Sequence, residues 1–412
     1  MKRLKLLLPL LLAFALSGCW DKLELEEQAY TVVLGVDKGE GDLIQATFQI
    51  SNPQVGSSDT GSAENEPPSD TITISAPDIL SAKELANSVI TRKISFSHLR
   101  TMIVSEEFAK SKFFLRIISS SMRDPEMRRE VNLIVSKEKA SEFIDRNKPN
   151  LETRPHKYFA FMQERWRDTG NVPYSTLNRY FTRLTEDSVF LAIYATTERT
   201  PAAPRKNEDS YKAGQIPQKN GDPVQLMGSA IFKEGKMIGT LTGEETRYVL
   251  LLRRKSLAHS FISTFPDPYD ERYQVTLRMI KVGNTDISVR VRNHGTTIHV
   301  KVPLKLQLLS IPSFTDYALD TKKQEVLKKT IQSILARDSK RLVEKMQQDV
   351  KGDPFLWNLS ARTQFISRET FETFNWANRF PQADVRIDFD LTLESFGKQL
   401  NPPVPQKGDE SD

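Results

Sequence analysis

The chain has 412 residues, of which 38% are hydrophobic and 27% are charged, and its formal net charge is +5. This length exceeds what one ordinary hydrophobic core organises, so two or three domains are expected, and the apolar fraction excludes global disorder. Charges of both signs are interspersed with little surplus, which argues against nucleic acid as a partner, because a nucleic-acid binder concentrates Lys and Arg.

The first 18 residues have the three parts of an export signal. Residues 1–5 carry three positive charges, and residues 6–16 form an apolar run that is too short to span a bilayer permanently. Two small residues then precede Cys19, the only cysteine in the chain. This arrangement resembles the lipobox of bacterial lipoproteins. Removal of residues 1–18 would leave a nearly neutral chain with a net charge of +2.

The lipobox resemblance implies that the chain is cut before Cys19 and that its thiol carries a diacylglycerol. The alternative is an ordinary secretory signal with a chance cysteine at the cleavage point. A lone thiol in an exported protein forms no disulfide framework, and lipidation accounts for it. Acyl chains hold a protein on a membrane at about 0.8 kcal/mol per buried methylene. No later stretch reaches eighteen apolar residues, so the mature chain is not expected to cross the membrane.

Predicted strands and helices alternate over residues 19–200, which is typical of an α/β or α+β sheet domain. The stretch 52–70 is rich in Gly, Ser, Pro and Asn and is predicted to be a mobile loop. The predicted strands are 29–36, 43–50, 71–75, 96–104, 131–135 and 189–196. The predicted helices start at Asp78, Glu106, Phe113 and Lys137.

Residues 150–180 mix aromatic side chains with arginines, and their secondary structure is not clear from the pattern. Such mixing could form a stacking platform for nucleic acid. Because no net charge gathers there, aromatics in the core and at its rim on a helix and a loop are the favoured interpretation. The aromatic residues are Phe159, Phe161, Trp166, Tyr174 and Tyr180.

Four prolines in polar surroundings predict a linker over residues 201–223. A C-terminal α+β domain is expected over 224–400; whether it divides near residue 310 stays open. It starts with a hairpin over 227–241, and Thr242 with Glu245 has the form of a capping box. The stretches 272–282, 285–291 and 296–309 alternate and predict an antiparallel sheet.

From residue 316 the apolar pattern changes to the helical period. It predicts a helix over about residues 320–350 that packs one face on the sheet, a more economical interpretation than a partner-binding groove. Asp353-Pro354 ends this helix, 383–393 alternates as a paired strand, and 401–412 is a polar tail. The predicted stripe comprises Val326, Leu327, Ile331, Ile334, Leu335, Leu342 and Met346.

Residue patterns for catalysis, cofactors or metals are missing from the sequence. There is no nucleophile elbow and no phosphate-binding glycine loop, and no two histidines have metal-ligand spacing on a helix. Carboxylate pairs such as Glu244-Glu245 are expected by chance at this charge content. We therefore predict no catalytic, cofactor-binding or metal site. The histidines are His98, His156, His259, His294 and His299.

Several ordered blocks resemble the C-subunit lipoproteins of spore germinant receptors, the Ger(x)C family. The most specific block is 228–246, and the blocks together span nearly the whole mature chain. Leu356-Trp357 departs from the pattern, in which a glycine is expected soon after the helix-ending aspartate. The matching residues are 18–21, 24–25, Ala29, 34–37, 96–98, 103–106, 109–110, Arg128, 131–137, Ala140, 228–233, 236–239, Leu241, 244–246, 353–355 and Trp376.

The resemblance implies a non-enzymatic, lipid-anchored subunit of a nutrient germinant receptor, on the outer face of the spore inner membrane. It implies contact with the polytopic A and B subunits of the receptor during germination, and an α+β fold of three mixed sheet domains. Two alternatives stay open. One is a lipid-anchored binding protein for a small germinant or a wall fragment, which would need a concave polar pocket. The other is an enzyme that degrades the cell wall.

Overall fold

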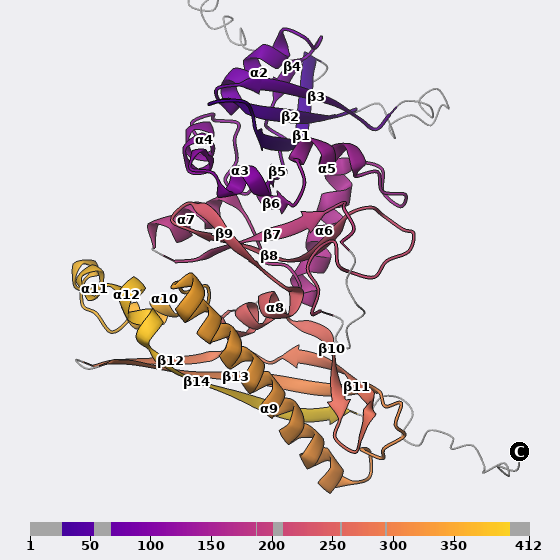
Figure 1. Cartoon of the computed structure of the whole chain (residues 1–412), viewed down its shortest axis with the longest axis vertical. Helices are drawn as coiled ribbons and strands as arrows, with labels where there is room; N and C mark the ends of the chain where they lie inside the picture. Colours follow the sequence, from indigo (N-terminus) through magenta and orange to yellow (C-terminus); the bar gives the residue numbers. More distant parts are fainter. Residues whose placement is uncertain are drawn as a thin grey trace, which may run out of the picture.

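A computed structural model describes residues 27–52, 67–186, 188–200, 209–255, 258–292 and 295–395. The export signal, Cys19, most of the predicted loop 52–70 and the tail 401–412 lie outside the described residues. The described strands form a nine-stranded sheet and a five-stranded sheet that follow one another along the long axis of the molecule (Figure 1). The predicted α+β class with mixed and antiparallel sheets is confirmed. The resemblance implied three sheet domains, whereas hydrogen bonding joins these strands into two sheets.

The nine-stranded sheet has a parallel centre and antiparallel flanks. Strands β1, β5, β6 and β7 run parallel, and their side chains are buried almost throughout, as expected for strands covered on both faces. The three-residue strand β4 pairs with the start of β1. In spatial order the strands are β3 (Ser69–Ala76), β2 (Ile44–Ser51), β1 (Gln28–Lys38), β5 (Thr101–Ser105), β6 (Asn132–Ser136), β7 (Phe190–Thr196), β8 (Gln225–Lys233) and β9 (Lys236–Leu241), with β4 (Lys93–Ser95) beside β1.

Helices cover both faces of this sheet. One face carries an aromatic core that includes Phe114, Tyr180 and Phe232, and the other carries a smaller core that includes Phe143 and Tyr158. Phe159 and Tyr180 are buried, so the interpretation as core aromatics is confirmed for these two residues of the unclear stretch. The helices are α2 (Ile79–Asn87), α3 (Glu106–Lys110), α4 (Phe113–Ser121), α5 (Ala140–Arg146), α6 (Pro155–Thr169) and α7 (Leu177–Thr185).

The first sheet continues past the predicted linker 201–223. Strand β8 pairs antiparallel with β7, and β9 pairs with β8, so hydrogen bonding carries the sheet to Leu241. Part of this stretch is itself well packed, because Tyr211 and Ala213 are buried in the aromatic core. The expected start of the second domain, residue 224, therefore lies before the end of the first sheet at Leu241. The prolines that suggested a linker lie in a connection between two neighbouring strands.

The second sheet is built around the long strand β13. Strands β11 and β12 pair with successive parts of one edge of β13, and β14 pairs in parallel along the other edge. Because β14 follows residue 310 and β13 precedes it, strands from both sides of that point share one sheet. The strands are β10 (Ser260–Asp267), β11 (Asp270–Lys281), β12 (Asp286–Arg292), β13 (Gly295–Ser310) and β14 (Asp384–Ser395).

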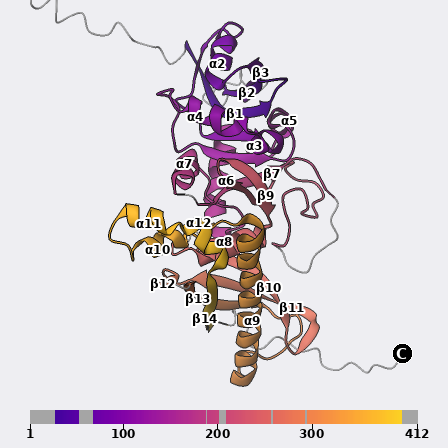
Figure 2. The ribbon, with the colours of Figure 1, turned by 60° about the vertical axis from the view of Figure 1, so that its left-hand side comes forward.

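Helix α9 (Thr321–Lys345), which lies along this sheet in Figure 2, continues as the π-helical turn η2 (Met346–Val350). The long predicted helix is confirmed, and Asp320 caps its start with bonds to two backbone amides. Most of the predicted stripe is buried, but Val326 is 41% exposed and lies on the edge of the packed face. Predicting it as part of that face was wrong, because its neighbour Leu327 takes the inward position.

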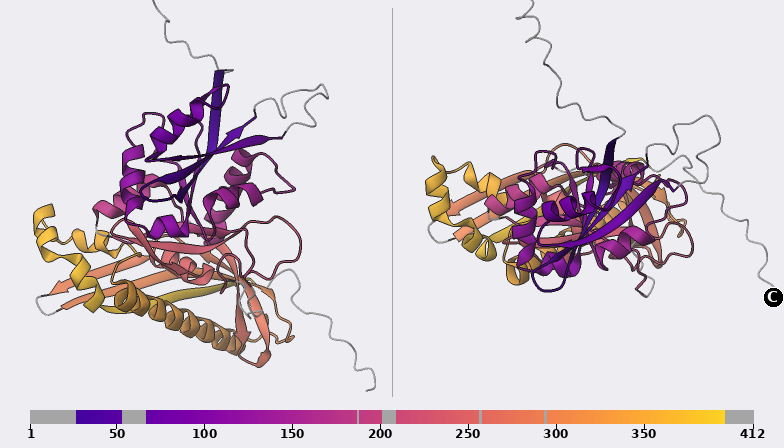
Figure 3. Two further views of the ribbon diagram at one scale, coloured as in Figure 1. Left: turned by 45° about the horizontal axis from the view of Figure 1, so that its top comes forward. Right: turned by 90° about the horizontal axis from the view of Figure 1, so that it is seen from above.

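Short helices follow the long one and end at the last strand. They are α10 (Trp357–Arg362), α11 (Arg368–Phe374), α12 (Trp376–Arg379) and the 3₁₀ turn η3 (Phe380–Gln382). Helix α11 has no buried residue, and in the view from above in Figure 3 it projects beyond the rest of the molecule. The core beneath α10 and α12 stacks Phe355, Trp357 and Phe380 against one another.

Candidate functional site at the junction of the two sheets

The stretch 228–246, on which the resemblance above mainly depends, lies where the two sheets meet. Gly228 has a φ of +86° at an irregularity of β8, and a side chain there would overlap the carbonyl oxygen of Leu241. Only glycine suits this close approach of the two strands. The β8–β9 hairpin then delivers the chain to helix α8 (Gly243–Leu252), which packs between the sheets. This stretch therefore positions α8 at the junction.

The predicted capping box at the start of α8 is confirmed. The amide of Glu245 donates to the Thr242 hydroxyl at 3.1 Å, and the Glu245 carboxylate accepts from the Thr242 amide at 2.9 Å. The other oxygen of Glu245 pairs with Lys345 of α9 at 2.7 Å. The cap thus also joins α8 to the long helix of the second sheet.

A cavity of about 340 Å³ lies beside α8. Apolar walls come from α8, β10, β11 and α9, and charged groups come from α8, α9 and the segment that precedes β8. No histidine is among the described residues that line it. Its lining includes Asp209, Glu244, Arg247, Tyr248, Phe261 and Asp338.

Arg247 joins three parts of the chain at this cavity. Its guanidinium pairs with the buried carboxylate of Asp209, donates to Asn171 Oδ1 at 2.6 Å and to the Thr169 carbonyl at 3.1 Å. It also lies over the Phe261 ring, 4.5 Å from the centroid. A buried arginine with this many partners fixes the position of α8 against the end of α6 and the first strand of the second sheet.

Glu244 is the carboxyl group of the cavity whose protonation changes near neutral pH. Burial, together with the neighbouring carboxylates of Asp209 and Asp338, raises the pKa of Glu244 to about 7. The Ser210 hydroxyl, which lies 3.3 Å from Glu244 Oε2, and the Arg247 cation act in the opposite direction. Such a carboxyl can exchange a proton near neutral pH or bind a cationic group.

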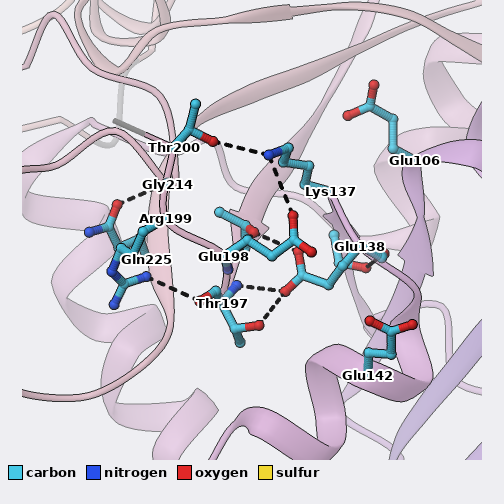
Figure 4. A network of polar contacts seen from close by, with 12 residues as sticks. Glu106, Lys137, Glu138, Glu142, Thr197, Glu198, Arg199, Thr200, Gly214 and Gln225 are labelled. Carbon is cyan, nitrogen blue, oxygen red and sulfur yellow. Dashed lines mark hydrogen bonds and ion pairs between the residues drawn. The ribbon is translucent and has the colours of Figure 1, made fainter. Parts of the chain in front are cut away.

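A second polar network surrounds Glu138, at the ends of β6 and β7 (Figure 4). Its carboxylate accepts from the hydroxyl of Thr196 at 2.5 Å and from the amide and hydroxyl of Thr197, each at 2.6 Å. Lys137 bonds Thr200 at 3.0 Å and pairs with Glu198 at 3.4 Å. Because the carboxylate of Glu138 is engaged by neighbouring donors, this network holds the chain after β7 in place.

The sequence-predicted site residue, Cys19, lies outside the described residues, so its lipidation stays a prediction. Of the histidines, His98 packs edge-on against Tyr30, and His299 lies 2.6 Å from Asp388. His294 lies outside the described residues. Within the described ranges, no three His, Cys, Asp or Glu side chains gather as a metal site would need.

The helices of the described part of the chain include none with the length and apolarity that a membrane span requires.

Two family models match the chain, one after the other. The model described as spore germination protein N-terminal domain matches residues 21–196, and the model described as spore germination B3/GerAC like, C-terminal, matches residues 227–397. The chain belongs to the GerAC-like family of spore germination proteins. The resemblance read from the sequence blocks is thereby confirmed.

Relatives in this family match over nearly the full length. Spore germination protein B3 of Bacillus subtilis is 22% identical over 93% of this chain and 95% of its own. Spore germination protein KC of the same organism is 23% identical over 84% of each chain. The crystal structure of the GerBC protein superposes with a TM-score of 0.52 and 16% identity, over 87% of this chain and 96% of that one. That likeness establishes the shared fold.

The charged cavity of this GerAC-like chain was not predicted from the sequence. Asp209, Glu244 and Asp338 are far apart in the chain, and no local pattern signals that they meet. The sequence does not single out Glu244, because pairs such as Glu244-Glu245 are expected by chance at this charge content. The one available signal was its place in the family-specific block.

Proposed function

We propose that this protein is a lipid-anchored subunit of a spore nutrient germinant receptor, held on the outer face of the spore inner membrane through Cys19. It acts by contact with the polytopic A and B subunits of the receptor and catalyses no reaction. The observation that carries this proposal is the order of parts: a lipobox ends at Cys19, and two germination-protein domains follow from residue 21 to residue 397. The names of the relatives describe germination, and none of them names a reaction.

Replacing the cysteine tests the anchor. A Cys19→Ala chain should move from the membrane fraction to the soluble fraction of spore extracts, because the thioether to lipid cannot form. Germination on nutrients should slow in the same spores. The readouts are immunoblots of the two fractions and the loss of optical density after nutrient addition.

A second variant tests whether membrane location is sufficient for function without the lipid itself. A Cys19→Ala chain that is carried by an uncleaved N-terminal transmembrane helix should restore both membrane location and germination. Normal germination on every nutrient after deletion of this gene and its paralogues would refute the receptor role. Co-purification of the A and B subunits with the wild-type chain from detergent extracts is the matching test of partner contact.

The junction cavity favours a second candidate function, capture of a small germinant or a wall fragment. A concave site with apolar walls and a few convergent polar groups is the usual form of a small-molecule site. Glu244 is the third acidic side chain at this cavity, beside Asp209 and Asp338, and its carboxyl would suit a ligand with an ammonium group. Calorimetry of the soluble mature chain with amino acids, sugars and muropeptides distinguishes the two candidates. Heat of binding that disappears in Glu244→Gln supports capture, and no heat with any of these ligands rejects it.

A further inference from the structure

The turn that joins α2 to β4 lies beside the place where the described chain begins. Gln28 at the start of β1 pairs in register with Lys93 of β4. Figure 1 shows α2 and β4 together at one end of the molecule, and Figure 3 shows the same end turned toward the viewer. The second sheet lies at the opposite end.

This turn combines exposed apolar and basic side chains. Leu85, in the last turn of α2, is 50% exposed, and Val89, just after the helix, is 66% exposed. Arg92 and Lys93 follow after Ile90 and Thr91, and both are exposed. No carboxylate of the described residues forms an ion pair with either of these two cations. We call the four residues the apolar-basic turn.

The backbone of the apolar-basic turn is firmly held, so its exposed side chains do not result from a frayed helix end. The Asn87 side chain accepts from the Ile94 amide at 2.8 Å and bridges the two ends of the turn. The amides of Val89 and Ile90 donate to the Ala86 carbonyl at 3.0 and 3.1 Å. Ile90 packs against the aromatic core. A fixed turn presents Leu85 and Val89 outward at little further cost in conformational entropy.

The expected anchor brings this end of the molecule close to the bilayer. Eight residues, 20–27, separate Cys19 from the start of β1. A chain of eight residues spans at most about 28 Å when fully extended. The apolar-basic turn is adjacent to β1 and is therefore within reach of the membrane surface, whereas the second sheet is farther away along the long axis.

We propose that the apolar-basic turn is a second membrane contact. Leu85 and Val89 enter the boundary between lipid headgroups and acyl chains, and Arg92 and Lys93 bind lipid phosphates. The inference rests on the proposed anchoring at Cys19, which supplies the high local concentration that makes so small a contact effective. Residues 20–27 carry four carboxylates and one lysine, so the attraction to anionic lipid has to come from the folded domain. The contact would orient the long axis away from the membrane.

The test uses the full mature chain with an N-terminal hexahistidine in place of Cys19, tethered to vesicles that contain a nickel-chelating lipid. Val89→Cys then supplies the only thiol for an environment-sensitive fluorophore. Its emission should rise and shift to the blue on vesicles with one-third phosphatidylglycerol, and far less on phosphatidylcholine alone. Arg92→Glu with Lys93→Glu should weaken the contact on anionic vesicles by about thirtyfold or more, since each of the two basic side chains near such a surface contributes about fivefold.

Matched variants at the far end of the molecule are the control. A label at Leu319→Cys, just before α9, should not respond to the vesicles, and Lys322→Glu with Lys329→Glu should leave the Val89 signal unchanged. Circular dichroism identifies any variant that fails to fold. A silent label at position 89 overturns the proposal and favours a partner subunit as the occupant. Because the tether replaces Cys19, this result is independent of whether lipidation occurs in cells.

Discussion

At the scale of single residues, Leu356 is held in a conformation that suits glycine better. Its φ is +63° and its ψ is +30°, in the left-handed region that favours glycine. A residue with a Cβ loses roughly 1 to 2 kcal/mol in this region. We predict that Leu356→Gly is more stable than Leu356→Ala by about 1 kcal/mol. Both variants lose the same side-chain packing, so urea denaturation of the pair isolates the backbone effect.

Leu359 in helix α10 is the control for this comparison. It is 42% exposed and has an ordinary helical backbone. At that position glycine should be less stable than alanine by about 1 kcal/mol, which is the opposite order. If glycine were the less stable residue at both positions, the left-handed conformation of Leu356 would carry no strain.

Glu244 should make the stability of the protein depend on pH. Because its pKa is raised to about 7 from 4.5, the folded state holds this proton more tightly than the unfolded state does. The contribution to stability is complete below pH 4.5 and is lost as the pH rises through 7. At pH 8 we expect Glu244→Gln to be more stable than the parent chain, on the order of 1 to 2 kcal/mol, and at pH 4 we expect no difference. Urea denaturation at both pH values measures this.

Glu245→Gln is the matched variant, since it changes the next carboxyl in the same turn of α8. Glu245 already pairs with Lys345, and its removal should produce no gain in stability at pH 8. An equal gain in both variants would assign the effect to the overall charge of α8 and not to the cavity.

At the scale of elements, Gly228 controls how the β8–β9 hairpin reaches α8. We predict that Gly228→Ala destabilises the protein by about 3 kcal/mol or more, because its Cβ would overlap the Leu241 carbonyl and its backbone is left-handed. Gly239→Ala in β9 is the control. The nearest atom to a Cβ there is 3.7 Å away, in the Ile231 side chain. Thermal unfolding followed by circular dichroism should show a large loss for the first variant and little for the second.

Elements were predictable from the sequence where a local signal exists. Alternating apolar residues predicted β14, apolar residues at helical spacing predicted α9, and the spacing of Thr242 and Glu245 predicted the cap of α8. Helices α6 and α7 could not be predicted from the sequence, because their aromatic side chains are divided between buried and exposed positions. Phe159 is buried, for example, and Phe161 is 53% exposed. The parallel pairing of β14 with β13 depends on long-range packing and has no local signature.

At the scale of the whole molecule, composition suggested a boundary that hydrogen bonding crosses. Prolines mark exposed connections, and an exposed connection can join two domains or two neighbouring strands of one sheet. The partners of a strand lie outside its own sequence, so the pairing of β8 with β7 could not be derived from residues 201–223. The core at the junction also joins the sheets, because Leu191 of β7 and Ile231 of β8 pack with residues of the second sheet.

Two truncated chains test whether the first domain ends near residue 200, as composition suggests, or near residue 242, where the first sheet ends. A chain of residues 20–200 lacks β8 and β9, so it exposes the edge of β7, whose seven residues are all buried in the intact protein. Such an edge invites aggregation, and we expect this fragment to be largely insoluble. A chain of residues 20–242 retains the complete sheet, and we expect it to be monomeric by size-exclusion chromatography, with a cooperative thermal transition. If the shorter fragment were as soluble and as cooperative as the longer one, the sheet would not need β8, and the boundary suggested by composition would be the structural one.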